Sequence, residues 1–278
     1  MTPLRCYNCG SDQHGEFAEE NGFSLVRCSH CGLLYVENPP SREAISQAHV
    51  QGRHDGSKEL DTTGSFDRSK ICRYLDVLGD LFGGRPHRAR SWLDVGCGHG
   101  EFMLAVRQFS GGAIAVEGSE PNEQKRRSAI AHGLRVSFHD LDAHSKTYDV
   151  ISLLNVYSHL PDPPAFLTSL KRLLTPGGEL ILETGDSAGL SAKEHHRPFY
   201  LPDHLSFASE AIVVAILERL GFEIVAVRKY PFPPFEWLGL VRELVKTFVP
   251  SRESGLRYYL RRQKYSQLDM YIRARLKP

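Results

Sequence analysis

The fold of this chain is decided by the stretch Ser91-Trp92-Leu93-Asp94-Val95-Gly96-Cys97-Gly98-His99-Gly100-Glu101-Phe102. It reads as a short apolar strand with an acid, followed by three glycines at alternate positions that lead into a helix. Because glycine has no Cβ, a ligand can lie directly against the backbone N–H groups of such a turn. The dinucleotide-binding pattern G-x-G-x-x-G places its third glycine one residue later. The spacing found here suits an amino-acid tail and a ribose better than a diphosphate.

On both sides of this turn, apolar strand-like runs alternate with segments of helical periodicity. We expect strands at 91–95, 113–119, 134–138, 148–154, 179–183 and 222–227, and helices at 66–82, 101–109, 122–132, 162–174 and from Ser209 to Leu220. Strict alternation predicts a doubly wound α/β fold around a parallel sheet. In such sheets the ligand binds at the carboxyl ends of the strands, which is where the glycine turn stands.

Several motifs carry a resemblance to a known family. The pattern Asp94-x-Gly96-x-Gly98-x-Gly100 resembles the first motif of class I S-adenosylmethionine (SAM) methyltransferases. The segments 113–122, 148–162 and 173–180 are similar, in the same order, to that family's second-strand, fourth-strand and pre-fifth-strand motifs. The resemblance covers about 66–229 and implies a mostly parallel, seven-stranded Rossmann-like sheet that binds SAM.

The resemblance also implies roles for individual residues. Glu120 would take both ribose hydroxyls, because a carboxylate accepts two hydrogen bonds from a diol, and it is preferred to Glu117. Asp140, with Asp142 in reserve, would lie near the adenine amino group. The cofactor-binding residues expected are Asp94, Gly96, Cys97, Gly98, Gly100, Glu120, Pro121, Asp140, Leu141 and Asn155.

Methyl transfer to an oxygen or carbon acid needs a general base that titrates near neutrality, and histidine is the natural residue. His204 is the first candidate, followed by His195 and His159, because all three follow the fourth or fifth strand. For each of them a hydrogen-bonded structural role competes with catalysis. In relatives an acid commonly precedes the equivalent of His159, whereas Ser158 stands here.

Four of the six cysteines form two C-x-x-C pairs, Cys6–Cys9 and Cys28–Cys31. Paired knuckles at this spacing predict a closed, structural Zn²⁺ site with four thiolate ligands. Two redox dithiols are the alternative, but neither pair opens a helix after a strand. The N-terminal part also resembles the zinc module fused to some sugar and secondary-metabolite methyltransferases. Cys72 and Cys97 read as small packing residues.

Composition limits the remaining choices. The chain has 278 residues with 41% hydrophobic and 24% charged residues and a net charge of +1, so no global field favours nucleic acid or membranes. No apolar run of about 18 residues or apolar signal core is present, and we expect a cytoplasmic protein. The expected organisation is a zinc ribbon (1–40), a linker (41–65), a SAM-binding domain (66–229) and a helical basic extension (230–278).

The extension is predicted to be helical because apolar residues recur at multiples of four, with eight Lys or Arg residues between 251 and 278. Such a helix would dock on its own domain or on a second subunit of a homodimer, or would contact RNA or an anionic membrane surface. The sequence therefore predicts methyl transfer from SAM to a small-molecule or glycan-like acceptor, at oxygen before carbon. An RNA methyltransferase and a non-catalytic SAM-binding or scaffold protein are the alternatives.

Overall fold

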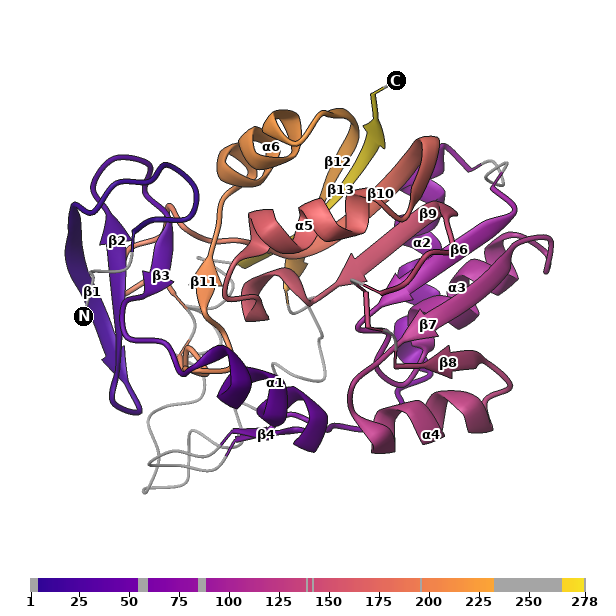
Figure 1. Ribbon diagram of the computed structural model, residues 1–278, viewed down its shortest axis with the longest axis horizontal. Helices are drawn as coiled ribbons and strands as arrows, with labels where there is room; N and C mark the ends of the chain where they lie inside the picture. The colour runs from indigo at the N-terminus through magenta and orange to yellow at the C-terminus, as the bar shows by residue number, and fades with distance from the viewer. Residues whose placement is uncertain are drawn as a thin grey trace, which may run out of the picture.

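A seven-stranded sheet with the order β12–β13–β10–β9–β6–β7–β8 forms the centre of the computed structural model (Figure 1). The structure describes residues 5–54, 60–84, 89–138, 140–141, 143–195, 197–232 and 267–277. Its elements are β1 (His14–Glu20), β2 (Phe23–Cys28), β3 (Leu34–Val36), α1 (Arg42–Gln51), β4 (Arg53–His54), β5 (Leu60–Asp61), α2 (Ser69–Phe82), β6 (Ser91–Val95), α3 (Glu101–Phe109), β7 (Ala115–Ser119), α4 (Glu123–Ala131), β8 (Arg135–Ser137), β9 (Tyr148–Leu154), η1 (Tyr157–His159), α5 (Pro163–Lys171), β10 (Leu174–Asp186), β11 (Ser206–Phe207), α6 (Glu210–Arg219), β12 (Phe222–Phe232) and β13 (Gln267–Leu276).

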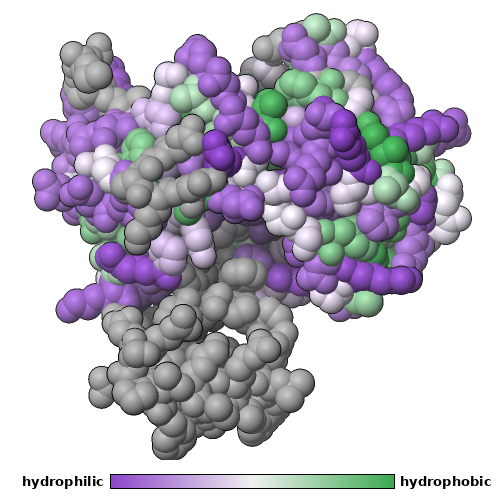
Figure 2. Space-filling view, turned by 90° about the horizontal axis from the view of Figure 1, so that it is seen from below, coloured by the Kyte–Doolittle hydropathy of each residue, from purple (hydrophilic) through white to green (hydrophobic). Residues whose placement is uncertain are grey.

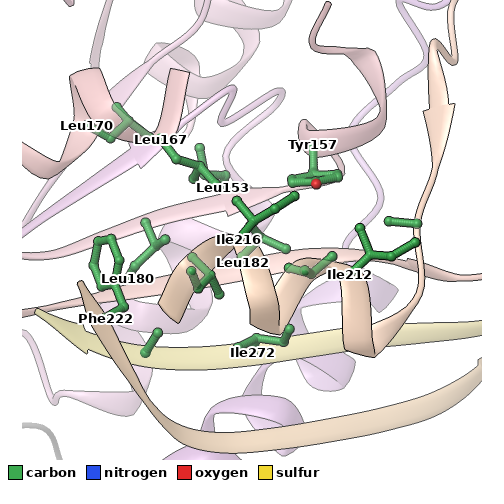
Figure 3. Packing of buried hydrophobic residues seen from close by; sticks show 14 of the residues in the cluster. Leu153, Tyr157, Leu167, Leu170, Leu180, Leu182, Ile212, Ile216, Phe222 and Ile272 are labelled. Carbon is green, nitrogen blue, oxygen red and sulfur yellow. The ribbon is translucent and has the colours of Figure 1, made fainter. Parts of the chain in front are cut away.

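Helices cover both faces of this sheet, as the alternation predicts. Leu153 and Leu182 pack on one face against α5 and α6, which contribute Leu167 and Ile216 among others (Figure 3). The residues that alternate with these along the strands, such as Ile181, pack on the other face against α2 and α3. Both sides of the central strands are therefore buried, which explains their nearly continuous apolar sequences.

Several predicted helix ends are confirmed. The Asn122 side chain accepts a hydrogen bond of 2.9 Å from the Lys125 N–H at the start of α4, and Asp162 caps α5 ahead of its first-turn prolines. Gly133 follows α4 with a φ of +73°. At α6, the predicted cap Ser209 makes no side-chain cap bond; Asp186 accepts from the Glu210 N–H instead.

The predicted helical extension is wrong over Gln267–Leu276, which forms β13 between β10 and β12 and runs antiparallel to both. A spacing of four residues is also an even number, so the apolar stripe that suggests a helix equally places its members on one face of a strand. Arg273 and Arg275, expected on a cationic surface, instead bind the buried Glu179 carboxylate at 2.8 Å each. Residues 233–266 of the predicted helical extension lie outside the described residues.

The N-terminal module is joined to the rest of the protein by a second sheet with the order β1–β2–β3–β11. Its last strand, β11, comes from the loop that follows β10, so the module pairs with the α/β domain through backbone hydrogen bonds. Cys6, Leu33 and Tyr35 belong to the same hydrophobic cluster as α6. The module is thus an integral part of the core.

The segment predicted as a linker, 41–65, is structured where it is described. Ser41 caps α1 by accepting from the Ala44 N–H at 3.1 Å, as its sequence suggests. The segment then packs onto the sheet's carboxyl edge: Asn122 Nδ2 donates to the Val50 carbonyl at 3.1 Å, and His99 Nε2 donates to the Thr63 carbonyl at 3.0 Å. Short polar segments show little periodicity, so only tertiary contacts reveal that this one covers the glycine turn.

The surface on the side of α1 and α4 is mainly hydrophilic, with hydrophobic residues scattered among polar ones (Figure 2). In the part of the chain that the structure describes, no helix is long and apolar enough to cross a membrane.

Candidate active site

The glycine turn after β6 has three glycines in the left-handed region, with φ of +70° at Gly96, +56° at Gly98 and +92° at Gly100. Their surroundings differ. A Cβ at Gly96 would lie 2.4 Å from Val156 Cγ2, and one at Gly100 would lie 2.2 Å from Leu134 Cδ1. A Cβ at Gly98 would meet nothing within 4 Å. Two glycines are therefore required by the protein's own packing, whereas Gly98 faces open space that a ligand can fill.

Glu120, at the end of β7, faces this turn. Its side chain accepts from the Gly98 N–H at 3.0 Å and from the Asn122 N–H at 2.9 Å, and the residue is only 5% exposed. Each carboxylate oxygen keeps further acceptor capacity for a diol. Glu117 is directed elsewhere, toward Lys146 at 2.5 Å and the Tyr148 hydroxyl at 2.9 Å. The geometry thus brings Glu120, and not Glu117, to the glycine turn.

Asp94, on β6, is buried, with 2% of its surface exposed. It accepts a 2.5 Å hydrogen bond from Ser152 Oγ, which in turn accepts from Trp92 Nε1 at 2.8 Å. Burial raises the pKa of Asp94 to about 7, and the nearby Glu120 and Glu101 add to this rise while Ser152 opposes it. A cationic amine placed beside this group would favour its ionised form.

This shift predicts a pH-dependent stability for the cofactor-free protein. Because the folded-state pKa lies above the ordinary 3.8, the stabilisation is complete below about pH 4 and is lost as pH rises to about 7. The Asn side chain stays neutral at every pH, so Asp94→Asn should avoid roughly 2–4 kcal/mol of the decrease in unfolding free energy that wild type shows. We therefore expect the variant to be more stable than wild type at pH 8.5. Urea unfolding at pH 5 and pH 8.5 measures it, and equal pH slopes in both proteins would contradict it.

The control is Asp149→Asn, which should lower the free energy of unfolding by the same amount at pH 5 and at pH 8.5. Hydrogen bonds from the Arg90 and Ser91 N–H groups lower the pKa of Asp149 overall, although its burial acts against them. Its contribution is therefore present above its unfolded pKa and lost in acid.

The other expected cofactor residues are distributed around the same edge. Cys97 is buried beneath the turn, where a Cβ at Gly118 would lie 2.6 Å from its Sγ. Pro121 is half-buried after Glu120, Leu141 packs against the main hydrophobic cluster, and Asp140 is exposed. Asn155 ends β9 with a φ of +54°. Asp142 lies outside the described residues.

Glu183 is a site residue that sequence reasoning missed. It lies near the carboxyl end of β10, is buried, and accepts a hydrogen bond from the Asn155 N–H. Burial raises the pKa of Glu183 to about 8, and Asp269 adds to the rise while Arg73 opposes it. An acid that ends a buried parallel strand is the sequence signal that could have found it, because strand ends meet at the ligand edge.

Beyond the ends of β9 and β10, four histidines gather around Asp203. His54 Nε2 lies 3.0 Å from Asp203 Oδ1, and His159 Nδ1 lies 3.3 Å from the same oxygen and donates to the Asp203 carbonyl at 2.8 Å. The His159 and His204 ring centroids are 4.8 Å apart, and those of His49 and His159 are 6.4 Å apart. No sequence pattern grouped His54 with the candidate bases, and His49 and Asp203 were missed.

The surroundings act differently on the pKa values of His159 and His204. Burial lowers the pKa of His204 to about 4, helped by His159. Burial also lowers the pKa of His159, but the Asp203 carboxylate more than offsets this and raises it overall. The pKa values of these two neighbouring histidines are therefore shifted in opposite directions.

His195, the second sequence candidate, lies apart from this cluster. Its ring packs among Phe17, Phe199 and Phe207, with centroid distances of 5.5, 5.6 and 5.4 Å. This aromatic group joins the N-terminal module to the loop before β11, so the packing favours a structural role for His195.

The two cysteine pairs converge as their spacing predicts. The Sγ atoms of Cys6, Cys9, Cys28 and Cys31 all lie within 4.8 Å of one another, with Cys6–Cys31 and Cys9–Cys28 separations of 3.5 Å. These separations exceed a disulfide bond of about 2 Å. Gly10 and Gly32 close the two turns with φ of +76° and +78°.

Comparison with known proteins agrees with this geometry. A family model described as "Methyltransferase domain" matches residues 65–227. A ubiquinone biosynthesis O-methyltransferase of Sodalis glossinidius is 30% identical over 117 residues, which cover 40% of this chain and 45% of that protein. A tRNA U34 carboxymethyltransferase of Pseudomonas fluorescens is 32% identical over 126 residues, covering 42% of this chain and 36% of that protein.

Solved structures share the fold at low identity. A coclaurine N-methyltransferase bound to N-methylheliamine and SAH has a TM-score of 0.54 and 15% identity, covering 74% of this chain and 72% of that one. The 4+2 cyclase SpnF has a TM-score of 0.53 and 18% identity, covering 77% and 84%. The chain spans less than half the length of the curated relatives it matches. The matched region is more than half of the chain, which belongs to the family of methyltransferase domains.

Proposed function

We propose that this protein transfers a methyl group from SAM to a small-molecule or glycan-like acceptor, at oxygen in the first place. One observation carries the proposal: the open side of Gly98 adjoins a Glu120 carboxylate that two backbone N–H groups hold in place. A vicinal diol and an amino-acid tail fit such a turn without side-chain obstruction. The similarity to an O-methyltransferase of ubiquinone biosynthesis supports oxygen as the methylated atom.

The bound SAM supplies an activated methyl group on its sulfonium. The protein's own groups then have to orient the acceptor and remove its proton. We assign the proton acceptor to His159 in its neutral form, in which Nδ1–H donates to the Asp203 carbonyl and Nε2 keeps a lone pair. The Asp203 carboxylate, which raises the pKa of His159, would stabilise the ring once it has accepted the proton. His204 has the same arrangement, with Nδ1 donating to the Phe199 carbonyl at 3.0 Å, and is the second candidate.

Glu120→Ala tests the cofactor assignment. Loss of two buried hydroxyl contacts should cost about 1–3 kcal/mol, which is a drop in SAM affinity of roughly 5- to 150-fold. Glu117→Ala is the matched control, because that acid lies on β7, three residues before Glu120, but contacts Lys146 and Tyr148. Calorimetric titration with SAM and its demethylated product measures both variants. Equal affinities in Glu120→Ala and wild type would contradict the assignment.

The acceptor class is tested separately. A screen of hydroxylated small molecules and glycans should show SAM-dependent methyl incorporation that His159→Ala abolishes. RNA methylation is the rival, supported by the similarity to a tRNA U34 carboxymethyltransferase. It predicts RNA affinity that falls steeply with salt.

The cyclase SpnF shows that this fold also serves other reactions, so SAM binding without turnover on any acceptor would indicate a non-methylating protein.

We also propose that the four-cysteine cluster holds Zn²⁺. A tetrahedral site with Zn–S bonds of about 2.3 Å places its sulfurs roughly 3.8 Å apart, close to the separations of 3.5 Å found here. With four thiolates no coordination position is left for substrate, so the ion would stabilise the N-terminal module and take no part in the reaction.

A further inference from the structure

A second group of metal-ligand residues lies apart from the cysteines. His49 comes from the last turn of α1, His54 from β4, and Asp203 from the loop before β11. Their ligand atoms all lie within 4.8 Å of one another. Three segments that are distant in sequence thus bring two imidazoles and one carboxylate to a common point.

The distances suit a metal ion. Metal–nitrogen and metal–oxygen bonds of about 2.0–2.2 Å place adjacent ligand atoms roughly 3.0–3.5 Å apart. His54 Nε2 and Asp203 Oδ1 are separated by 3.0 Å. The side chains of His54 and Asp203 are 4% and 14% exposed, so these two ligands are largely shielded from water.

His49 supplies an independent observation. Its Nε2 is buried and has no hydrogen-bond partner among the described residues. An unsatisfied buried polar atom costs about 1–3 kcal/mol unless a partner occupies the space beside it. The ring packs edge-on to His54 with a centroid distance of 6.1 Å, so the ring that carries the unsatisfied nitrogen lies beside the cluster.

His159 holds the Asp203 side chain in place. His159 Nδ1 donates to the Asp203 carbonyl at 2.8 Å and lies 3.3 Å from Asp203 Oδ1, so it orients that carboxylate. Because this nitrogen carries the proton, it cannot itself bind an ion at that oxygen. Ligating carboxylates in metal sites are typically held by hydrogen bonds of this kind.

We propose that His49, His54 and Asp203 bind a divalent transition-metal ion of the class that prefers imidazole with carboxylate, such as Zn²⁺ or Co²⁺. Three protein ligands leave at least one coordination position for water or for an acceptor oxygen, unlike the closed cysteine site. The ion ties the α1–β4 segment to the loop before β11, beside the ends of β9 and β10. Its binding is independent of the proposed methyl transfer.

Cobalt titration of the full chain, after demetallation, tests the proposal. We expect two ions per chain: one with thiolate-to-cobalt charge-transfer absorption from the cysteines, and one with ligand-field absorption only. His49→Ala and His49→Gln should each lose the second ion, with at least a 100-fold weaker affinity, and retain the thiolate absorption. His132→Ala, an exposed histidine after α4, is the matched control and should bind two ions.

The outcomes are decisive in both directions. Retained thiolate absorption shows that a variant is folded, so loss of only the second ion supports the site. A wild-type chain that binds no ion with ligand-field absorption only, or two ions in both His49 variants, would overturn the proposal. In that case the cluster is a hydrogen-bonded network, and Asp203→Asn should lower the thermal midpoint without any change in metal content.

Discussion

Gly98→Ala is expected to abolish most SAM binding while leaving the protein folded. A Cβ at this position meets no protein atom within 4 Å, so the substitution costs only the strain of a φ of +56°, about 1 kcal/mol. The same Cβ occupies the space in which the ligand would contact the backbone. We expect at least a tenfold loss of affinity, equivalent to about 1.4 kcal/mol, with a nearly unchanged thermal midpoint.

Gly100→Ala provides the comparison, because it tests packing instead of ligand access. Its Cβ would lie 2.2 Å from Leu134 Cδ1, at a φ of +92°, so the fold itself must shift. A loss of about 3 kcal/mol or more in unfolding free energy is expected. Calorimetry and urea unfolding measure the two effects separately. If Gly98→Ala binds SAM as wild type does, the ligand does not lie against this turn.

Cys28→Ser is expected to release zinc and to destabilise the whole chain, not the N-terminal module alone. The cysteine cluster shares its hydrophobic core with α6 and β10 through residues such as Leu33 and Ile216. Structural zinc contributes on the order of 10 kcal/mol in small zinc modules. Even a loss of about 3 kcal/mol should lower the thermal midpoint by roughly 5–10 °C.

Metal analysis, thermal unfolding with and without chelator, and hydrogen exchange of β1–β3 measure this effect. Cys72→Ser is the matched control, because Cys72 is an exposed cysteine on α2. It should keep its zinc and its thermal midpoint. Wild-type protein without zinc, or Cys28→Ser with undiminished zinc, would contradict the prediction.

Local patterns were sufficient wherever a residue's role depends on its immediate neighbours. The turn at 96–100, the helix starts at Asn122 and Asp162, and the four cysteines were all predicted from local sequence, and their local geometry agrees. Spacing misled where it is compatible with two structures. Apolar residues four apart suit a helix and a strand equally, so β13 was predicted as part of a helix.

The sequence by itself determined the α/β order, the glycine turn and the paired cysteine knuckles, because each depends on periodicity or on short spacing. The choice of Glu120 over Glu117 came from the resemblance to the methyltransferase family. Only the tertiary structure decided which distant residues meet. It brought His49, His54 and Asp203 to one point, separated His195 from His159, and buried Glu183 beside Asn155. The physical reason is that burial, and contact between strand ends and loops, arise only when segments far apart in the chain pack together.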